Sequence, residues 1–421
     1  MKKQLLSVLF VLLGALTVWA QAPSALDQLK ADPKKAYGTD YPYLFQDAAM
    51  TRAPRGYKPF YISHYGRHGS RYYWNETLYR NLDTLLEAAR QKNLFTPEGE
   101  AFYERFLELR PELMTGISEL TQVGWDQHQR IARTMYNRFP EVFRKGGNVL
   151  AISSLSGRCM LSMSAFCQEL VQCNPAIEIR EQASRFTLDG VVPQDKQNPV
   201  KHEFPKASPR FIANMAGFPK DTLLYRNVIS RVFTDTEGLP GNMRQIAENL
   251  VSLYTSLPSI SHEGMMDGLV TDQELVDHWE TSNLDAYIWV YSDQYQMIPI
   301  LEDFIKKADD VLEGSSDRVA DLRFGHDSCI GPLTVLMGLG GADLDPEDPY
   351  QVKECYRNWG TCKAANIQLI FFRDKKASDP VLVKGLLNGE EVSLPVETDC
   401  YPYYRWDRLR AFYLERCQSV Q

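Results

Sequence analysis

Two histidines and two arginines lie close together in the stretch PFYISHYGRHGSRYYW, which runs from Pro59 to Trp74. Gly66 and Gly69 allow the backbone to turn sharply there and to approach a ligand closely, because glycine has no Cβ atom. Arginine guanidinium groups match phosphate oxygens with paired hydrogen bonds, and a neutral histidine nitrogen can attack phosphorus. The stretch therefore indicates chemistry on phosphate or on another tetrahedral oxyanion.

Residues of the same kinds occur at two other places in the chain. Arg158 follows the apolar segment NVLAISS, Asn148 to Ser154, and His326 and Asp327 follow the segment VADLRFG. In open α/β sheets, ligands bind outside the carboxyl ends of the strands, so neighbouring strands would bring these side chains to one spot. Clustered arginines repel one another unless an anion lies between them, which favours a phosphate site. The candidate site residues are Arg67, His68, Arg71, Arg158, His326 and Asp327.

A phosphohistidine mechanism accounts for these residue types. One histidine takes the phosphoryl group, and the arginines stabilise its charge as Mg²⁺ does in other phosphoryl transfers. The departing alkoxide needs a proton, and Asp327 is the carboxylate placed to give it. The residues alone do not choose between His68 and His326 as the nucleophile.

The elements that would position these residues alternate between strands and helices. Short strands are predicted at Lys58–Ser63, at Asn148–Ser154 and over VADLRF, and each is followed by a segment in which apolar residues have helical spacing. Further strands are predicted in AANIQLIFF and on both sides of the Asn388–Gly389 hairpin turn. Strand, polar turn and helix repeated three times predict an α/β fold with a mostly parallel sheet flanked by helices.

The chain is predicted to have two parts. Residues 21–195 and 297–421 are expected to form the α/β domain, and residues 196–296 an inserted α-helical domain. The active site is expected in the cleft between them. Within these parts, residues 21–55 are predicted to be an extended arm, and residues 180–231 to be irregular, Pro-rich chain.

The first residues, MKKQLLSVLFVLLGALTVWAQAP, have the form of a signal peptide, with cleavage expected after Ala20. We therefore expect residues 1–20 to be removed and the mature protein to be periplasmic or secreted. No later stretch is long and apolar enough to span a membrane, so no membrane partner is expected after cleavage. The formal net charge of −8 argues against nucleic acid as a partner, while a locally basic pocket still suits a small anionic phosphate ester.

The 8 cysteines have two alternative interpretations. An even number in an exported protein is compatible with disulfide bonds, and Cys355 with Cys362 and Cys400 with Cys417 are close enough in sequence to pair. The alternative is that several of them are buried free thiols.

The HxxxH spacing of His64 and His68 raises the alternative of a zinc site. That motif needs both histidines on one face of a helix, and the neighbouring glycines disfavour a helix here. Three arginines would also repel a cation. We therefore expect no metal and no cofactor, with His64 a hydrogen-bonded strand residue and His128 a surface or interdomain residue.

Three segments carry a family resemblance. RHGSR, Arg67 to Arg71, resembles the signature of the histidine phosphatase superfamily, and GHDS, Gly325 to Ser328, resembles the His-Asp motif of its acid phosphatase and phytase branch, which includes multiple inositol polyphosphate phosphatase-like proteins. SSLSGRCMLSMSAF is similar to the segment that carries the family's middle arginine. The resemblance implies a phosphoglycerate mutase-like fold, with His68 as the phosphorylated nucleophile and Asp327 as the proton donor. It also implies that the phosphoryl oxygens are held by Arg67, Arg71, Arg158 and His326.

The implied function is an exported histidine acid phosphatase that hydrolyses phosphate monoesters, with phytate and other inositol phosphates among the candidate substrates. Sugar phosphates and other monoesters are also candidates, because Tyr72–Trp74 and Ser328–Cys329 depart from the phytase pattern. The alternatives are a phosphoglycerate mutase-like phosphotransferase and a non-catalytic periplasmic phosphate-ester binding protein. The export signal and Asp327 argue against the first, and the presence of both His68 and Asp327 argues against the second.

Overall fold

The computed structural model describes residues 23–43, 45, 49–193, 223–344, 346, 349–375 and 379–419. The expected signal peptide, residues 1–20, and the first part of the expected insert, residues 196–222, lie outside these ranges. Within the described ranges, no helix is long and apolar enough to cross a membrane.

An 8-stranded sheet forms the centre of the molecule, in the order β3-β2-β4-β1-β5-β6-β7, with β8 paired to β6. The strands β3, β2, β4 and β1 are parallel, and β5, β6, β7 and β8 pair in antiparallel fashion. The predicted α/β fold is therefore confirmed, as a mixed sheet with a mostly parallel core. The strands are β1 (Tyr57–Arg67), β2 (Gly147–Ser153), β3 (Ile177–Ala183), β4 (Arg318–Gly325), β5 (Asn366–Asp374), β6 (Leu382–Leu387), β7 (Glu390–Val392) and β8 (Tyr404–Arg405).

The two central parallel strands are covered on both faces, so consecutive side chains along them are buried. β1 is buried without interruption from Tyr61 to Arg67, and β4 from Ala320 to Gly325. The prediction for residues 180–231 is wrong in part, because β3 runs to Ala183 and further helices follow it. The edge position of β3 explains the miss: only Ile177 of its sequence IEIREQA is buried, and the strand carries no apolar run.

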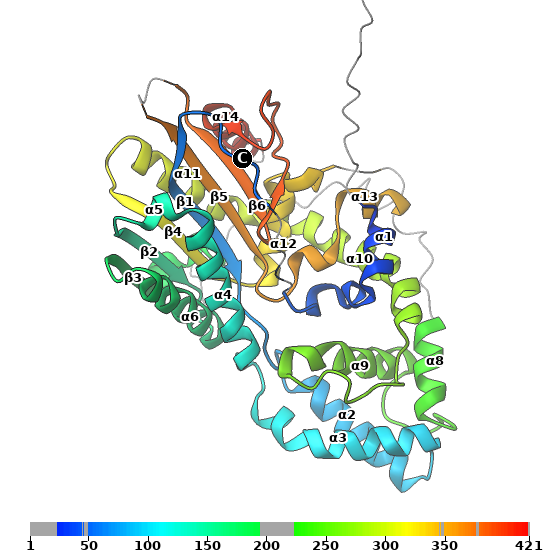
Figure 1. Ribbon diagram of the computed structural model, residues 1–421. Helices are drawn as coiled ribbons and strands as arrows, with labels where there is room; N and C mark the ends of the chain where they lie inside the picture. The colour runs from blue at the N-terminus through cyan, green and yellow to red at the C-terminus, as the bar shows by residue number, and fades with distance from the viewer. Residues whose placement is uncertain are drawn as a thin grey trace, which may run out of the picture.

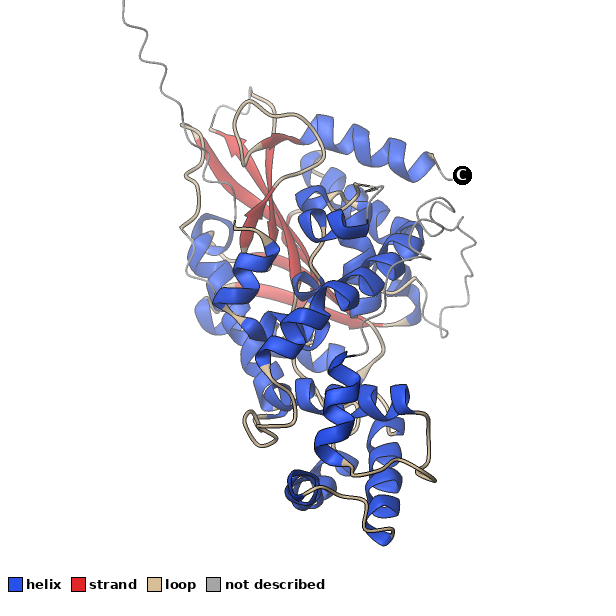
Figure 2. Cartoon of the chain, turned by 90° about the vertical axis from the view of Figure 1, so that its right-hand side faces the viewer, coloured by secondary structure: helices blue, strands red, loops and turns tan. Residues whose placement is uncertain are grey.

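Helices cover both faces of the sheet (Figures 1 and 2). They are α4 (Gln122–Arg138), α5 (Pro140–Phe143), α6 (Gly157–Cys173), α11 (Ile298–Leu312), α12 (Asp327–Leu336) and α14 (Trp406–Gln418). The ring of Phe324 lies 5.5 Å from that of Phe166 in α6, while the Nε atom of Arg323 donates to Asp303 in α11 at 2.7 Å. Because consecutive strand residues point to opposite faces, α6 and α11 lie on opposite sides of the sheet.

A group of helices beyond the carboxyl ends of the parallel strands combines segments from both sides of β2 in the sequence (Figure 1). It contains α2 (Thr77–Gln91), α3 (Pro97–Thr115), α8 (Leu223–Val232) and α9 (Met243–Ser256). α2 packs against α9 and α3 against α8, and the rings of Phe95 and Phe233 stack with centroids 5.8 Å apart. α10 (Asp272–Asp293) contacts both α8 and α12. The boundaries expected for the two domains stay a prediction.

The N-terminal segment is not the extended arm that was predicted. Ser24 accepts a hydrogen bond from the Asp27 N–H and caps α1 (Ala25–Ala31), and Asp32 and Pro33 then start the 3-10 helix η1 (Pro33–Asp40). η1 packs against α10 and against η7 (Asn358–Thr361). This packing brings the N-terminal segment beside the edge of the sheet where β1 and β4 end.

The hairpin predicted at Asn388–Gly389 is confirmed between β6 and β7, with φ angles of 53° and 80° as a tight turn requires. All eight cysteines are free thiols, so neither of the two considered disulfide pairs is present. The remaining helical segments are η2 (Arg185–Gly190), η3 (Leu257–Ile260), η4 (Gln294–Met297), η5 (Leu339–Gly341), η6 (Pro349–Gln351) and α13 (Val352–Cys355).

Candidate active site

The three loops expected to carry the chemistry meet at one edge of the sheet. β2, β4 and β1 are adjacent and parallel, with Arg67 opposite Gly325 and Ser153 opposite Phe324 in the register. The rings of His68 and His326 lie 5.6 Å apart. The six residues predicted from the sequence therefore occupy the ends of neighbouring strands and the loops and helix starts that follow them.

The loop after β1 is held by close backbone contact with α4. A Cβ atom on Gly69 would lie 2.4 Å from the carbonyl oxygen of Gly124, so only glycine fits at this point. The Gly69 N–H donates to the Ser162 hydroxyl at 3.0 Å, and the Ser70 N–H donates to the Gln127 side chain at 2.9 Å. Two helices thus fix the loop that presents His68 and Arg71.

His68 is 1% exposed and presents one nitrogen to the site. Its Nδ1 lies 2.9 Å from the carbonyl oxygen of Gly69, and because a carbonyl can only accept, Nδ1 carries the proton. The described residues provide no hydrogen-bond partner for Nε2. Burial and the charges of Arg71, Arg67 and Arg158 hold the pKa of His68 well below its usual range. The imidazole is therefore neutral, with the lone pair of Nε2 available.

His326 differs from His68 because both of its nitrogens have partners. Arg158 Nη2 donates to Nδ1 over 3.4 Å, so Nδ1 is the unprotonated nitrogen, and Nε2 donates to the hydroxyl of Ser154 over 3.1 Å. Cys159 Sγ lies within 3.8 Å of the same ring. The residue types alone left the two histidines as alternatives, and the family resemblance implied His68. Of the two, only His68 keeps a ring nitrogen without a hydrogen-bond partner among the described residues.

The three arginines are positioned by polar contacts yet keep donors for a ligand. Arg67 donates to Asp327 Oδ2 at 2.7 Å, Arg71 to its neighbour's carbonyl oxygen at 2.8 Å, and Arg158 to the Ser118 hydroxyl at 2.7 Å. The Nε atom of each arginine is buried without a hydrogen-bond partner. Since buried donors are normally satisfied, these orphaned groups indicate an oxyanion that would complete the site.

Asp327 starts α12 and faces the same cluster. Burial opposes its ionisation, but the charges of Arg67, Lys363 and Arg71 outweigh burial and hold the pKa of the carboxyl group below its usual range. Its second oxygen accepts the Ser328 N–H at 2.9 Å. Asp327 is therefore an anion paired with Arg67 in this structure.

Sequence reasoning missed two charged residues of this cluster, Lys363 and Asp40. Lys363 is 2% exposed, and its Nζ donates to Asp40 Oδ1 at 2.6 Å. The sequence gives one sign of this burial: Lys363 directly precedes the apolar run AANIQLIFF, so it lies beside a strand that is predicted to be buried. Nothing in the sequence pattern pairs it with Asp40.

His64 and His128 form an aromatic cluster with Phe166 and Phe324 beneath the loop. The ring of His64 lies 5.3 Å from that of Phe166 and 5.4 Å from that of Phe324, and the ring of His128 lies 5.7 Å from that of Phe324. Both histidines are 1% exposed, and none of their four ring nitrogens has a hydrogen-bond partner within the described part of the chain. The predictions of a hydrogen-bonded His64 and a surface His128 are therefore wrong.

This cluster should make the protein less stable in acid. Burial lowers the pKa of His128 from 6.5 to about 3, so the fold favours the neutral ring. The stabilisation is complete above the unfolded-state pKa and is lost at about 1.4 kcal/mol per pH unit as the pH falls from 6.5 towards 3. We expect His128→Phe to reduce this loss, measured as the free energy of unfolding in denaturant at about pH 8 and about pH 4.

The comparison at about pH 8, where His128 is neutral in both states, isolates the packing cost of the new ring. An equal loss of stability between the two pH values in wild type and His128→Phe would contradict this account.

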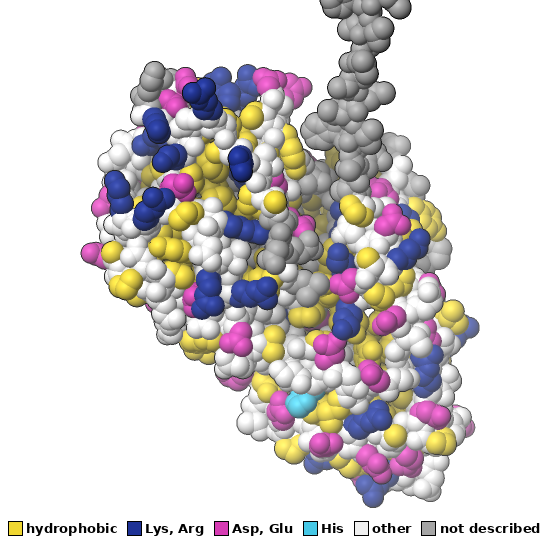
Figure 3. All heavy atoms as spheres, in the orientation of Figure 1, with side chains coloured by type: hydrophobic (Ala, Val, Ile, Leu, Met, Phe, Trp, Pro, Cys, Tyr) yellow, Lys and Arg dark blue, Asp and Glu magenta, His cyan; other side chains and the backbone are white. Residues whose placement is uncertain are grey.

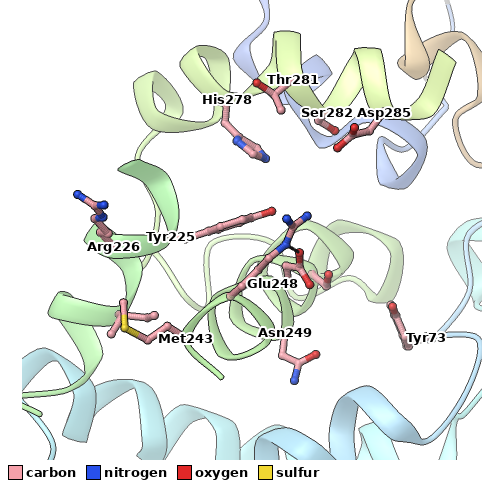
Figure 4. Close-up of a pocket in the computed structure, with 13 residues that line it drawn as sticks. Tyr73, Tyr225, Arg226, Met243, Glu248, Asn249, His278, Thr281, Ser282 and Asp285 are labelled. Carbon is pink, nitrogen blue, oxygen red and sulfur yellow. Dashed lines mark hydrogen bonds and ion pairs between the residues drawn. The ribbon is translucent and has the colours of Figure 1, made fainter. Parts of the chain in front are cut away.

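A cavity of about 580 Å³ lies beyond the loop, between α8, α9 and α10. Tyr225 and His278 point into it, and Tyr73 borders it from the loop side (Figure 4). Arg244 Nε pairs with Glu248 at 2.6 Å along one wall. The three residues Tyr72–Trp74 therefore lie in different environments. Tyr72 packs at Gly116, Tyr73 borders the cavity, and Trp74 is 56% exposed.

The face of the molecule in the orientation of Figure 1 carries charges of both signs. On the face seen in Figure 3, lysine and arginine side chains are interspersed with aspartate and glutamate. The site, by contrast, gathers Arg67, Arg71 and Lys363 as buried side chains. Among the described residues, no group of three or more His, Cys, Asp and Glu side chains could hold a metal ion.

Comparison with known proteins identifies the fold. No family model and no curated protein sequence matches the chain. The multiple inositol polyphosphate phosphatase of Bifidobacterium longum, in complex with inositol hexasulfate, matches with a TM-score of 0.71 at 19% identity, over 92% of this chain and 100% of that one. The same protein in complex with phosphate gives 0.72 at 20% identity, over 91% and 98%. The phytase from D. castellii gives 0.67 at 14% identity, over 96% and 89%.

These neighbours belong to the histidine acid phosphatase branch, so the resemblance inferred from RHGSR and GHDS is confirmed at the level of the fold. At such identities the similarity establishes the architecture. The chemistry has to be argued from this chain's own residues.

Proposed function

We propose that this protein hydrolyses phosphate monoesters through a phosphohistidine formed at His68. The observation that carries the proposal is the neutral ring of His68, whose Nδ1 donates to the Gly69 carbonyl oxygen while no described residue is a hydrogen-bond partner of Nε2. The charges of Arg71, Arg67 and Arg158 act on this ring, and the Nε donor of each arginine has no partner among the described residues. A phosphoryl group beside Nε2 would satisfy these donors. The similarity in fold to phosphatases and phytases supports the same reading.

In the first half-reaction, His68 Nε2 attacks phosphorus while the bond from phosphorus to the ester oxygen breaks. Arg67, Arg71 and Arg158 offset the charge on the phosphoryl oxygens, and His326 Nε2–H offers a further donor once it turns from Ser154. The leaving oxygen takes a proton from Asp327 and departs as an alcohol.

Asp327 must gain a proton before it can donate one. The positive charges that keep it ionised are neutralised when a phosphate ester binds, which raises its pKa. A monoanionic phosphate ester also brings a proton into the site. In the second half-reaction, Asp327 takes a proton from water as the water oxygen attacks phosphorus and the bond to Nε2 breaks.

None of the six site residues lines the cavity, but Tyr73, two residues after Arg71, borders it, and we propose that the alcohol part of the ester extends towards it. Inositol phosphates are proposed as substrates, supported by the inositol polyphosphate phosphatase among the fold neighbours. Export to the periplasm or the medium is proposed from the N-terminal segment that ends at Ala20.

A panel of esters tests the proposed function. We expect phosphate release from an aryl phosphate, a sugar phosphate and phytate, assayed from acidic to neutral pH. EDTA should leave the rates unchanged, because guanidinium groups carry the positive charge that a metal would otherwise supply. Absence of release from every ester would refute the proposal, and a loss in EDTA that a metal ion restores would refute the metal-free mechanism.

A further inference from the structure

A buried lysine–aspartate pair links two distant parts of the chain at the phosphate site. Lys363 Nζ donates to Asp40 Oδ1 at 2.6 Å, across a sequence separation of 323 residues. The side chain of Lys363 is 2% exposed and that of Asp40 is 27% exposed. A lysine is rarely buried to this extent, and a buried charge requires a partner. Burying this pair therefore costs free energy of folding, which indicates that the pair has a role at the site.

The backbone around Lys363 is tied directly to the nucleophile loop. The Ala364 N–H donates to the carbonyl oxygen of His68 at 3.0 Å, and the Arg67 N–H donates to the carbonyl oxygen of Ala365 at 2.8 Å. Ala364 has a φ of 60°, a left-handed conformation that is uncommon for a residue with a Cβ atom. Lys363 thus stands in a constrained turn that contacts the nucleophile's own peptide.

The same two segments also hold Arg67. Its Nη1 donates to the carbonyl oxygens of Thr39 and Thr361, at 2.6 and 2.7 Å. Thr39 directly precedes Asp40, and Thr361 stands two residues before Lys363. The ion pair therefore clamps together the two chain segments that position the arginine partner of Asp327.

Lys363 and Asp40 contribute to the balance of charge at the phosphate site. The site contains four cationic side chains, Arg67, Arg71, Arg158 and Lys363, and two carboxylates, Asp40 and Asp327, an excess of two positive charges that matches a phosphate dianion. The charged side chains that lower the pKa of Asp327 are Arg67, Lys363 and Arg71. His326, whose ring is neutral in this hydrogen-bond arrangement, and Cys159, Cys329 and Tyr356 are its other titratable neighbours. Burial and the two nearest arginines lower the pKa of Lys363 to about 7 against the effect of Asp40.

We infer that Lys363, held by Asp40, is a positioning residue of the phosphate site: the pair fixes the two segments that hold Arg67 against Asp327 and places a buried ammonium group beside them. The inference rests on the proposed function, because Asp327 must be protonated in the substrate complex to release the alcohol. A neighbouring ammonium group favours the ionised carboxylate, so Lys363 limits the pH range in which the proton is available and restores the carboxylate for the second half-reaction.

The test compares Lys363→Met with Lys384→Met. Lys384 is a matched control: it is 1% exposed, pairs with Glu391 and donates to the Thr51 carbonyl oxygen at 2.8 Å, away from the arginines. We expect Lys363→Met to move the alkaline limb of kcat, measured with an alkyl phosphate, upward by about one pH unit, and to weaken inorganic phosphate binding about tenfold in calorimetry. Lys384→Met should do neither.

Lys363→Met leaves the Asp40 carboxylate without its partner, which could by itself disturb folding. A second variant controls for this effect. The double variant Asp40→Asn/Lys363→Met removes both charges and should shift the limb in the same direction. An unchanged limb and unchanged phosphate affinity in both Lys363 variants would overturn the inference. If the wild-type protein released no phosphate from any ester, the proposed function would fail, and the phosphate titration alone would decide whether Lys363 belongs to the site.

Discussion

Replacing His68 by alanine should lower kcat for an aryl phosphate by at least about 10⁴-fold, because it removes the atom that forms the bond to phosphorus. A good leaving group does not restore the rate, since every substrate must transfer its phosphoryl group to the same nucleophile. The measurement is phosphate release at saturating substrate for wild type and His68→Ala.

Binding of inorganic phosphate is the control for this variant. The arginines that surround the phosphate remain in His68→Ala, so its phosphate affinity, measured by calorimetry, should stay within about tenfold of wild type. Turnover at more than about a hundredth of the wild-type rate by a variant that binds phosphate would remove His68 as the nucleophile.

Asp327→Asn should produce losses that depend on the leaving group. An alkoxide needs a proton as it departs, whereas an aryl oxide with a low pKa does not, so kcat/KM should fall by about 10²- to 10⁴-fold for an alkyl phosphate and far less for an activated aryl phosphate. The constant kcat/KM is the right quantity, because it reports the step in which His68 is phosphorylated.

In the same variant, kcat should depend on the leaving group in a different way from kcat/KM. If Asp327 also activates water, hydrolysis of the phosphohistidine becomes slow for all substrates, and kcat should fall equally for both esters. Equal losses of kcat/KM on both esters would contradict the role of Asp327 as the acid.

The six site residues could be predicted from the sequence because each follows the end of a short apolar strand. Strands of this kind, buried on both faces, are recognisable from composition, and the carboxyl ends of parallel neighbours meet at one edge. Strand positions alone left His68 and His326 as alternatives, and the preference for His68 came from the family resemblance. The hydrogen bonds of the two rings add an independent argument for the same proposal.

The features that sequence reasoning missed depend on contacts between distant segments. Asp40 and Lys363 meet only because η1 packs on η7, and the polar edge strand β3 is defined by pairing with β2. The burial of His128 did leave a signal. It lies three residues before Ile131 and seven before Met135, on the apolar face of α4, so the helical spacing itself placed it inside.

The central claim is a covalent bond between His68 and phosphorus, and trapping that intermediate tests it most directly. Asp327→Asn mixed with an activated aryl phosphate and quenched in alkali should retain a phosphoryl group, which mass spectrometry of the peptides should place on His68. The group should be stable in alkali and labile in acid, as expected for a phosphoramidate. Rapid turnover with no adduct, or an adduct on His326 or another residue, would contradict the account.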